Sequence, residues 1–324
     1  MKQSHNSIIV LFAVINGKIN NIIIIMEGLA NLGATCAINS LIQMLYRNER
    51  FKQLILSSTV PENTITFELK DLFNVLDTYK NNVTPNRFIS HFYNVFNGIF
   101  RRNEDIDICE LFLFLIQKIH EDMAFDINVK KEFLNIYDEH NYNIAIHNNF
   151  KYSNIYKLFQ GSHMHTIQCM TCYHTTKTFE PFIMISLDIQ SNSSISELLD
   201  NYYTTETRMK DDWICDKCKM RCSYNKTTAI WKFPEILFIS LNRFKDMTTK
   251  NVEIVDVNTT ISLNKIYNLH SIGFHHGILN SGHYNSVCRN TNNNFILYDD
   301  NNVAVVNNLE PLLKTSNSYL LCYD

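Results

Sequence analysis

The sequence predicts an α+β protein whose first half is helical and whose second half forms a sheet. Three observations predict this class. Apolar side chains recur at helical spacing up to about residue 155, short β-rich segments follow, and the second half carries two C-x-x-C pairs that indicate a metal-binding insertion. The 324 residues suit one large domain or two ordinary ones, and a hydrophobic share of 45% suits a substantial buried core.

The N-terminus carries two short apolar runs on either side of Asn16-Gly17. Neither run, residues 8–15 or residues 22–26, approaches the roughly 20 residues that span a bilayer. An Asn-Gly pair between β-branched runs favours a hairpin or an extended lead-in, and the poor cleavage region argues against a signal peptide. We therefore expect residues 1–26 to be an extension outside the native domain, with Met1 and Met26 both open as the start.

Helices make up the predicted first half. In residues 35–46 (TCAINSLIQMLY), apolar side chains at helical spacing follow a turn of small residues, which predicts a helix whose first turn begins at Cys36. The same period predicts a helix over residues 67–79. Thr84-Pro85 predicts the start of another, with Thr as the cap and Pro in the first turn. Residues 107–121 are apolar enough for a long buried helix.

Short β-rich segments dominate after about residue 155. Residues 184–189 (MISLDI), 236–241 (ILFISL) and 294–298 have the length and the β-branched or aromatic content of strands. We therefore expect a sheet in the second half, with a polar, cysteine-bearing stretch inserted into it as a metal finger.

Charge and cysteine content exclude several classes of partner and compartment. Lys and Arg number 29 against 32 Asp and Glu, a net charge of −3. Without a basic excess, we expect neither nucleic acid nor a membrane surface as the principal partner. Nine cysteines that include two C-x-x-C pairs favour metal over a disulfide framework. We therefore expect a reducing intracellular compartment, cytoplasmic or nuclear, which would be the host's if the source is viral.

Residues 28–43 (GLANLGATCAINSLIQ) place a cysteine, Cys36, at a helix N-terminus. Unpaired backbone N–H groups and the positive end of the helix dipole favour the thiolate there, which is the form that a nucleophile requires. Asn31, five residues earlier, carries an amide that can donate to a developing oxyanion. On residue types alone, a small buried cysteine at a turn–helix junction is the alternative interpretation.

Residues 282–300 (GHYNSVCRNTNNNFILYDD) hold a second candidate set. Two adjacent strands joined by a polar loop would set His283 and Asp299 side by side. The imidazole could then take the thiol proton while the carboxylate orients the ring. Asp300 would point the other way on a strand. Alone, Gly-His-Tyr is more often found around a structural histidine.

Two C-x-x-C turns predict a structural zinc site. Four thiolates suit tetrahedral zinc and leave no open position for a substrate. The long stretch between the pairs, residues 173–214, implies a finger hairpin. Cys222 could supply a fifth thiolate or remain free. The four predicted ligands are Cys169, Cys172, Cys215 and Cys218.

Together, these motifs resemble the ubiquitin-specific proteases. GLANLGATCAINSLIQMLY is similar to the family's cysteine box, and GHYNSVCRN followed by FILYDDNNVAVV is similar to its histidine box. DICELFLFLIQKIHED resembles the acidic-glutamine helix of the family. CMTCYHTTKTFEPFIMISLDI and CDKCKMRC resemble its zinc-finger halves, and TAIWKFPEILFISLNRF resembles the segment after the finger. All five motifs stand in the family's order over about residues 27–324, which makes the resemblance specific.

The resemblance implies a papain-like cysteine peptidase fold of the ubiquitin-specific protease type, described as a hand. Residues 27–324 would form the catalytic domain, with a helical thumb over about residues 27–155. A β-sheet palm and the fingers would occupy residues 156–324. The zinc-ribbon fingers insertion would lie within about residues 165–225 and hold one structural zinc ion.

The resemblance also implies a role for each matching residue. Cys36 maps to the nucleophile, His283 to the base, Asp299 to the third triad member and Asn31 to the oxyanion residue. Asp300 matches a second acidic residue that assists in some relatives. The implied activity is thiol-dependent hydrolysis of isopeptide or peptide bonds at the C-terminal glycine of ubiquitin. The expected partners are ubiquitin and ubiquitinated proteins, and we expect a monomer.

Four positions depart from the family's pattern. Ala37 stands where Tyr is usual, Cys109 replaces Gln, Leu111 replaces Phe and Phe295 replaces Trp. None of these changes removes a reacting group, although those at Cys109 and Leu111 alter contacts near the cleft for the ubiquitin tail. Two alternatives therefore stay open: a ubiquitin-binding scaffold with weak or no activity, and a protease for another ubiquitin-like modifier.

Overall fold

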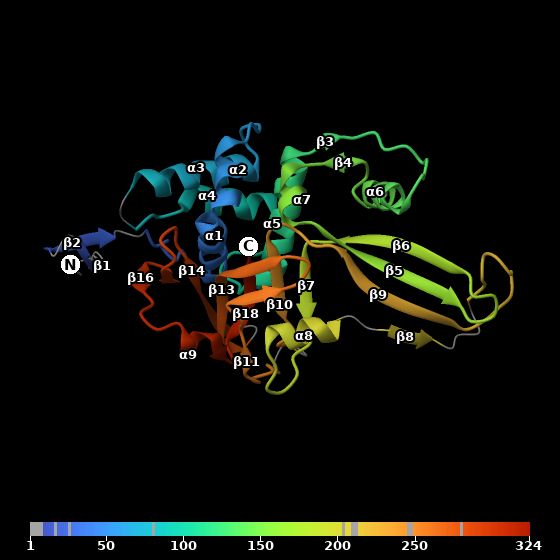
Figure 1. The fold of residues 1–324 in the computed structure, drawn as a ribbon. Coiled ribbons are helices and arrows are strands. Elements are labelled where there is room, and N and C mark those ends of the chain that lie inside the picture. Colours follow the sequence, from blue (N-terminus) through green and yellow to red (C-terminus); the bar gives the residue numbers. More distant parts are fainter. Residues whose placement is uncertain are drawn as a thin grey trace.

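The protein has the predicted α+β organisation, with helices above a sheet and an arm of long strands extending to one side (Figure 1). The computed structural model describes residues 9–15, 18–24, 27–79, 82–202, 205–208, 213–244, 249–278 and 281–324. The described helices are α1 (Cys36–Arg47), α2 (Glu49–Ser57), α3 (Ile65–Thr78), α4 (Asn86–Val95), α5 (Ile108–Met123), α6 (Ile136–His147), α7 (Asn154–Phe159), α8 (Ile195–Tyr202) and α9 (Glu310–Leu313). None of them is long and apolar enough to cross a membrane.

The N-terminal runs form the predicted hairpin. β1 (Ile9–Ile15) pairs antiparallel with β2 (Lys18–Ile24) in continuous register. The turn at Asn16-Gly17 lies outside the described residues.

The first predicted helices are present, with one correction at their starts. α1 begins at Cys36, as expected, and α5 begins after Asp107, whose carboxylate accepts the backbone N–H groups of Cys109 and Glu110. The side chain of Thr84 does not cap α4, contrary to our expectation. Pro85 occupies the N-cap position, and the backbone N–H of Asn86 is already paired with the carbonyl of Thr84.

The palm sheet contains eight described strands, in the order β16-β15-β14-β13-β18-β10-β7 with β12 paired to β13. Neighbours are antiparallel except for β10 and β7, which run parallel. The three predicted strands appear within it as β7, β10 and β15. The bounds are β7 (Met184–Leu187), β10 (Leu237–Leu241), β12 (Thr260–Ser262), β13 (Ile266–Ile278), β14 (Ser281–Arg289), β15 (Phe295–Asp299), β16 (Asn302–Val305) and β18 (Ser318–Tyr323).

Both faces of the palm sheet are covered, and a hydrophobic core lies on each. Along β18, Leu320 and Cys322 belong to the core shared with the helical layer, whereas Leu321 and Tyr323 belong to the core on the opposite face. This alternation is the period-2 pattern of a strand buried on both sides. Helix α1 lies against the sheet, and every residue from Cys36 to Tyr46 is buried.

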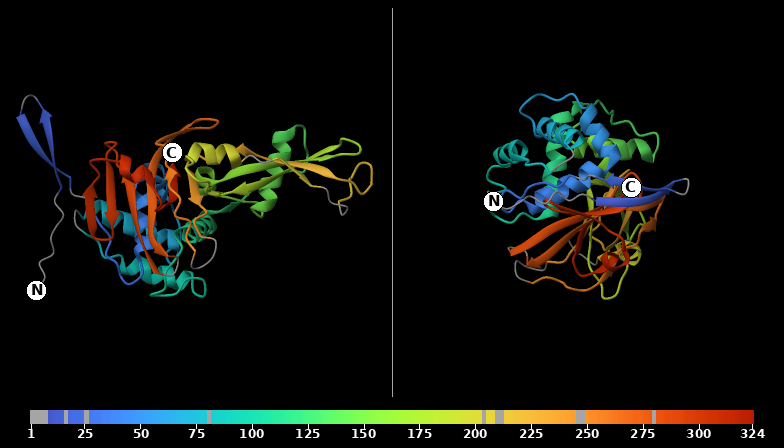
Figure 2. Two further views of the ribbon diagram at one scale, coloured as in Figure 1. Left: turned by 90° about the horizontal axis from the view of Figure 1, so that it is seen from below. Right: turned by 90° about the vertical axis from the view of Figure 1, so that its left-hand side faces the viewer.

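A second, four-stranded sheet forms the arm seen in Figures 1 and 2 and has the order β6-β5-β9-β8. Its strands extend away from the palm, and the turns at its far end carry the two C-x-x-C pairs. The bounds are β5 (Gly161–Cys169), β6 (Thr175–Phe182), β8 (Thr205–Arg208) and β9 (Tyr224–Lys232). Two-stranded pairings join β3 (Phe125–Asp126) to β4 (Lys151–Tyr152) and β11 (Val255–Asp256) to β17 (Lys314–Thr315).

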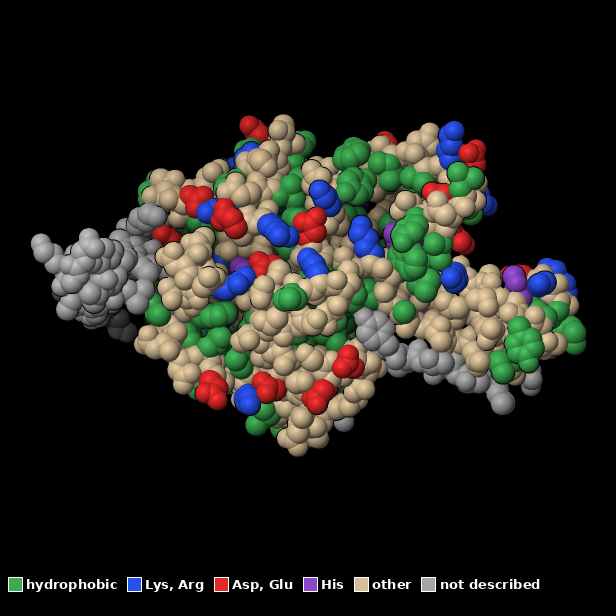
Figure 3. Space-filling view, in the orientation of Figure 1, with side chains coloured by type: hydrophobic (Ala, Val, Ile, Leu, Met, Phe, Trp, Pro, Cys, Tyr) green, Lys and Arg blue, Asp and Glu red, His purple; other side chains and the backbone are tan. Residues whose placement is uncertain are grey.

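On the face shown in Figure 3, basic and acidic side chains are interspersed in the upper part, whereas mostly acidic side chains lie along the lower edge of the main body. A cavity of about 600 Å³ lies between α6, α7 and β9. Its lining contains none of the residues predicted to be catalytic, so the cavity is not the candidate active site.

Candidate active site

Cys36 is the first residue of α1 and is 6% exposed. The backbone N–H groups of Tyr284 and Ala37 donate to its sulfur. Tyr284 lies on β14, which packs against α1. The nucleophile candidate is therefore held at the junction of the helical layer and the palm sheet.

The surroundings of Cys36 raise the pKa of its thiol. Burial is the main cause, and the negative charges of Asp300 and Asp105 act in the same direction. The hydrogen bonds from Tyr284 and Ala37 lower the pKa but do not outweigh burial. Our expectation of a thiolate favoured by the helix end is therefore wrong for the free protein. That expectation left out the desolvation of the sulfur.

His283 and Asp299 meet as predicted. The register pairs Ser286 with Tyr298, so Asp299 comes opposite Asn285, and His283 lies two residues further along the same face of β14. His283 Nε2 and Asp299 Oδ1 are 2.5 Å apart. Within the described part of the chain, no hydrogen bond joins His283 to Cys36. The imidazole is thus oriented by the carboxylate, with Nδ1 left for another partner.

Asp300 does not point away from this pair, which corrects our expectation. Strand β15 ends at Asp299, and Asp300 adopts a left-handed backbone conformation with φ of 52°. The alternation of a strand therefore no longer applies to it. A carboxylate oxygen of Asp300, one of Asp299 and a ring nitrogen of His283 all lie within 4.8 Å of one another.

The carboxylate of Asp300 binds the loop that carries Asn31. Asn31 Nδ2 donates to Asp300 Oδ2 over 2.9 Å. Asn31 Oδ1 accepts from the backbone N–H groups of Gly33 and Thr35 and from the Thr35 hydroxyl. These contacts fix the plane of the Asn31 amide and leave one of its N–H groups for another acceptor.

Asn39 is a functional candidate that sequence reasoning missed. It lies one turn after Cys36 on α1 and is 3% exposed. Its Nδ2 donates to Asp300 Oδ1 over 2.7 Å and contacts the carbonyls of Leu29 and Ala30 at 3.3 Å. The available signal was the spacing of Asn39 and Gln43, two polar residues one turn apart on a helix that is otherwise strongly apolar.

The four predicted zinc ligands are brought together at the tip of the arm. Their sulfurs all lie within 4.8 Å of one another, with separations of 3.6 Å for Cys172 and Cys215 and 4.0 Å for Cys169 and Cys218. Zn–S bonds of about 2.3 Å in a tetrahedron place the sulfurs roughly 3.8 Å apart. The donor set and its spacing therefore fit zinc. Cys222 lies outside this set, although its sulfur is 3.3 Å from that of Cys169.

Comparison with known proteins decides the family. The family model described as ubiquitin carboxyl-terminal hydrolase matches residues 27–323. The chain belongs to the ubiquitin carboxyl-terminal hydrolase family. The protein is therefore a cysteine-type deubiquitinating hydrolase with the ubiquitin-specific protease fold, and the predicted family, fold and reaction class are confirmed.

Individual relatives agree with this assignment. Ubiquitin carboxyl-terminal hydrolase 4 of Arabidopsis thaliana is 28% identical over 92% of the chain and 92% of its own length. Ubiquitin carboxyl-terminal hydrolase 8 of Saccharomyces cerevisiae is 24% identical over 92% of the chain and 70% of its own length. Among solved structures, a SAGA DUB module of Ubp8, Sgf11, Sus1 and Sgf73 bound to monoubiquitin gives a TM-score of 0.73 at 22% identity. That match covers 92% of this chain and 68% of the other.

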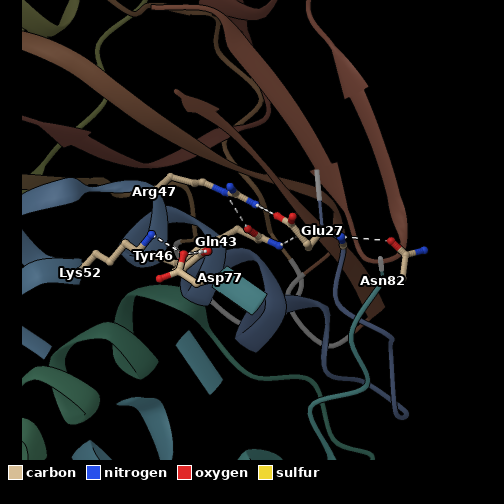
Figure 4. Close-up of polar contacts among 8 residues, drawn as sticks. Glu27, Gln43, Tyr46, Arg47, Lys52, Asp77 and Asn82 are labelled. Carbon is tan, nitrogen blue, oxygen red and sulfur yellow. Dashed lines mark hydrogen bonds and ion pairs between the residues drawn. The ribbon is translucent and has the colours of Figure 1, made fainter. Parts of the chain in front are cut away.

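A polar network anchors the C-terminal end of α1, the helix that begins at Cys36 (Figure 4). Gln43 Nε2 donates to the carbonyl of Glu27, and Arg47 Nη2 pairs with the Glu27 carboxylate at 3.3 Å. Tyr46 donates to Asp77 on α3 over 2.7 Å, and Lys52 pairs with the same carboxylate. Glu27, which lies at the start of the segment before Cys36, is therefore bound to α1 by a hydrogen bond and an ion pair. The same segment is also hydrogen-bonded next to the sheet, through Leu29 and Asp300.

Gly282 leaves room for the buried imidazole of His275 beside His283. A Cβ at this position would lie 2.2 Å from His275 Nε2 and 2.9 Å from the carbonyl of His276. His275 is fully buried, and burial lowers its pKa to about 4. The glycine before His283 is thus required by the close approach of β13 and β14.

Proposed function

We propose that Cys36 is the nucleophile of this deubiquitinase, His283 its general base and Asp299 the residue that orients the base. The contact of 2.5 Å between Asp299 Oδ1 and His283 Nε2 carries the proposal. A carboxylate on Nε2 favours the tautomer with its proton there and its lone pair on Nδ1. Nδ1 is then the atom that takes the proton of the Cys36 thiol when the two side chains approach.

The proposed reaction proceeds through an acyl-enzyme. His283 accepts the thiol proton, and the Cys36 sulfur attacks the carbonyl carbon of the C-terminal glycine of ubiquitin. The backbone N–H of Cys36 and the remaining N–H of Asn31 stabilise the oxyanion. The C–N bond then breaks as His283 gives its proton to the leaving amine. Water attacks the thioester, its proton passes to His283 and then to the departing sulfur, and the carboxylic acid is released.

Asp300 assists by position in this proposal. Its carboxylate accepts from Asn31 and from Asn39, so it holds the oxyanion residue relative to the helix that carries the nucleophile. It also lies close enough to His283 to strengthen the negative field around the imidazolium that forms during catalysis.

Ubiquitin and ubiquitinated proteins are the proposed partners. The family assignment and the likeness to a module bound to monoubiquitin support this choice.

We place the thumb at about residues 27–155 and the palm and fingers at residues 156–324. We also propose a monomer in a reducing intracellular compartment. Light scattering of the purified protein tests whether it is a monomer. The nine cysteines, all free of disulfides, support the reducing compartment.

One structural zinc ion is proposed at the tip of the fingers. When bound, it would cross-link two turns that are far apart in sequence and so stabilise the arm. Four protein sulfurs leave no position for substrate, so the ion has no part in the proposed reaction. Metal analysis of the purified protein is expected to find one zinc ion per chain. Folded protein without metal would contradict the assignment.

Ubiquitin with a thiol-reactive electrophile at its C-terminus tests the nucleophile and the modifier together. Intact mass is expected to show one adduct on the parent protein and none on Cys36→Ser. Cys222→Ser is the matched control, since Cys222 is more exposed than Cys36, and it is expected to form the adduct. An adduct on Cys36→Ser would overturn the assignment of the nucleophile.

The same assay separates the two alternatives. A panel of other modifiers with the same electrophile identifies a protease for a ubiquitin-like protein, which would react with one of them and not with ubiquitin. A scaffold without activity would bind ubiquitin and form no adduct. Single-turnover cleavage of a ubiquitin conjugate then distinguishes a slow enzyme from an inactive one.

A further inference from the structure

Five sulfurs, not four, gather at the tip of the fingers. Cys222 lies between the second C-x-x-C turn and β9, and its sulfur is 3.3 Å from that of Cys169. This separation is shorter than the sulfur–sulfur contacts of 3.6 Å and 4.0 Å within the predicted zinc set. The finger therefore contains one more thiol than tetrahedral zinc requires.

The mutual distances of the sulfurs distinguish four of the cysteines from the fifth. The sulfurs of Cys169, Cys172, Cys215 and Cys218 all lie within 4.8 Å of one another, and that of Cys222 does not belong to this group. The backbone N–H of Cys172 donates to Cys169 Sγ over 3.4 Å, whereas the Cys222 thiol donates to the carbonyl of Met220 over 3.5 Å. Hydrogen bonds to a metal-binding sulfur orient it and support its charge. The first four cysteines are therefore placed as ligands, and Cys222 lies beside them.

Of the four proposed ligands, Cys169 is the one that Cys222 contacts. Its sulfur contacts that of Cys169, and among the described residues it makes no hydrogen-bonding contact with Cys172, Cys215 or Cys218. A distance of 3.3 Å is shorter than the roughly 3.8 Å between two sulfurs on one zinc ion, so Cys169 and Cys222 would not both bind the ion at these positions. Cys222 is therefore placed to exchange with Cys169, whose sulfur it contacts, and not with Cys172.

We infer that Cys222 is a reserve zinc ligand that replaces Cys169. The inference rests on the proposed zinc site. In the exchange, the Cys222 thiol releases its proton to solvent and its sulfur bonds to the metal. The bond from Cys169 breaks and that sulfur takes up a proton. The charge of the site and the number of thiolates on the ion are unchanged, and no oxidant or reductant is needed.

Single cysteine variants of the full chain test the exchange. Cys169→Ala removes the proposed ligand that Cys222 contacts. Cys172→Ala is the matched control, because it removes the other cysteine of the same C-x-x-C turn, for which no contact with Cys222 is found among the described residues. Each variant is made with Cys222 intact and with Cys222→Ser. Zinc per chain is measured after dialysis against a chelator. The thiolate charge-transfer absorption of the Co²⁺-loaded protein reports the number of sulfur ligands independently of activity.

Cys169→Ala is expected to keep one metal ion and the four-thiolate absorption of the parent. Cys172→Ala and the double variant Cys169→Ala with Cys222→Ser are expected to lose one quarter of that absorption. The metal affinity of both variants is expected to fall by at least roughly 10- to 100-fold. A loss of that size already follows when a ligand loses a hydrogen-bonding partner, and these variants lose a ligand itself. Equal loss in Cys169→Ala and in the double variant would overturn the inference.

The controls separate this inference from the zinc proposal. Cys222→Ser alone is expected to bind zinc as the parent does, and loss of metal from it would make Cys222 an ordinary ligand. Parent protein that binds no metal would instead contradict the zinc site itself. Should Cys169→Ala fail to fold, Cys169→Ser replaces it, because its hydroxyl oxygen still accepts the backbone N–H of Cys172.

Discussion

Asn39 Nδ2 donates to Asp300 Oδ1 over 2.7 Å, although the two residues are 261 positions apart in the chain. This hydrogen bond joins the helix that carries Cys36 to the end of the strand that carries Asp299. Asn31 donates to the other oxygen of the same carboxylate. The position of Cys36 relative to the strand that ends at Asp299 is therefore set by hydrogen bonds of Asn31, Asn39 and Asp300, and not by the thiol itself.

Loss of the Asn39 amide is expected to weaken both the fold and catalysis. In Asn39→Ala, the carboxylate of Asp300, the buried carbonyl of Leu29 and the partly buried carbonyl of Ala30 lose a donor, which lowers the free energy of unfolding by about 1–3 kcal/mol. The value of kcat falls because Asn31 and Asp300 are less well held. Urea denaturation and a fluorogenic ubiquitin substrate measure the two effects. Asn74→Ala, an exposed position on α3, is the control and should change stability by less than about 0.5 kcal/mol.

Replacement of Asp299 is expected to impair catalysis without unfolding the protein. Asp299→Asn removes the charge that orients His283 and lowers kcat/KM by roughly 100- to 10,000-fold. The thermal midpoint should hardly move, since the side chain of Asp299 is 36% exposed. Steady-state kinetics and a melting curve check both parts. A variant that keeps most of the parent's kcat/KM would remove Asp299 from the triad.

The reactivity of Cys36 toward a small alkylating agent is expected to rise continuously with pH. Burial raises the pKa of the thiol above its ordinary value of 9.0, so the thiolate is the minor form at neutral pH and grows as pH rises through that pKa. Rates of iodoacetamide labelling between pH 6 and pH 10 measure this. Asp300→Asn removes a negative charge that raises the pKa and should shift the curve to lower pH. A plateau already reached below pH 7 would refute the expected direction.

Gly282→Ala is expected to disturb β14, the strand that carries His283. The added methyl group would meet His275 Nε2 at 2.2 Å, and β14 must move to accommodate it. Overpacking of this kind costs about 1–3 kcal/mol of stability, and the displacement of His283 lowers kcat. Ser281→Ala, at the exposed neighbouring position, is the control and should preserve both values. Parent-like stability and activity in Gly282→Ala would show that the contact relaxes freely.

The ion pair between Glu27 and Arg47 is expected to matter more than pairs at the surface. The side chains are 5% and 16% exposed, and Glu27→Ala leaves the Arg47 guanidinium without its carboxylate, at a cost of about 3–5 kcal/mol. Glu121→Ala breaks the exposed pair with Lys118 and should cost less than about 1 kcal/mol. Chemical denaturation of the two variants gives the comparison. Equal effects would show that Arg47 finds another partner.

The sequence predicts those parts of the site that depend on local pattern. The start of α1 at Cys36 follows from helical spacing, and the meeting of His283 with Asp299 follows from two strands joined by a short loop. Asp300 was misplaced because its direction depends on one left-handed backbone angle beyond the strand. The contacts of Asn39 and the raised pKa of Cys36 depend on burial between segments that are remote in sequence, which no local pattern contains.

Strand β18 lies between β13 and β10 in the middle of the palm sheet, although it follows both of them in sequence. Without β18, β13 and β10 have no common neighbour, and the sheet that carries His283 is divided into two parts. Its pairing is therefore completed only after every other described strand of that sheet has been synthesised. A chain truncated before β18 would keep the thiol and the imidazole without the strand that joins β13 to β10.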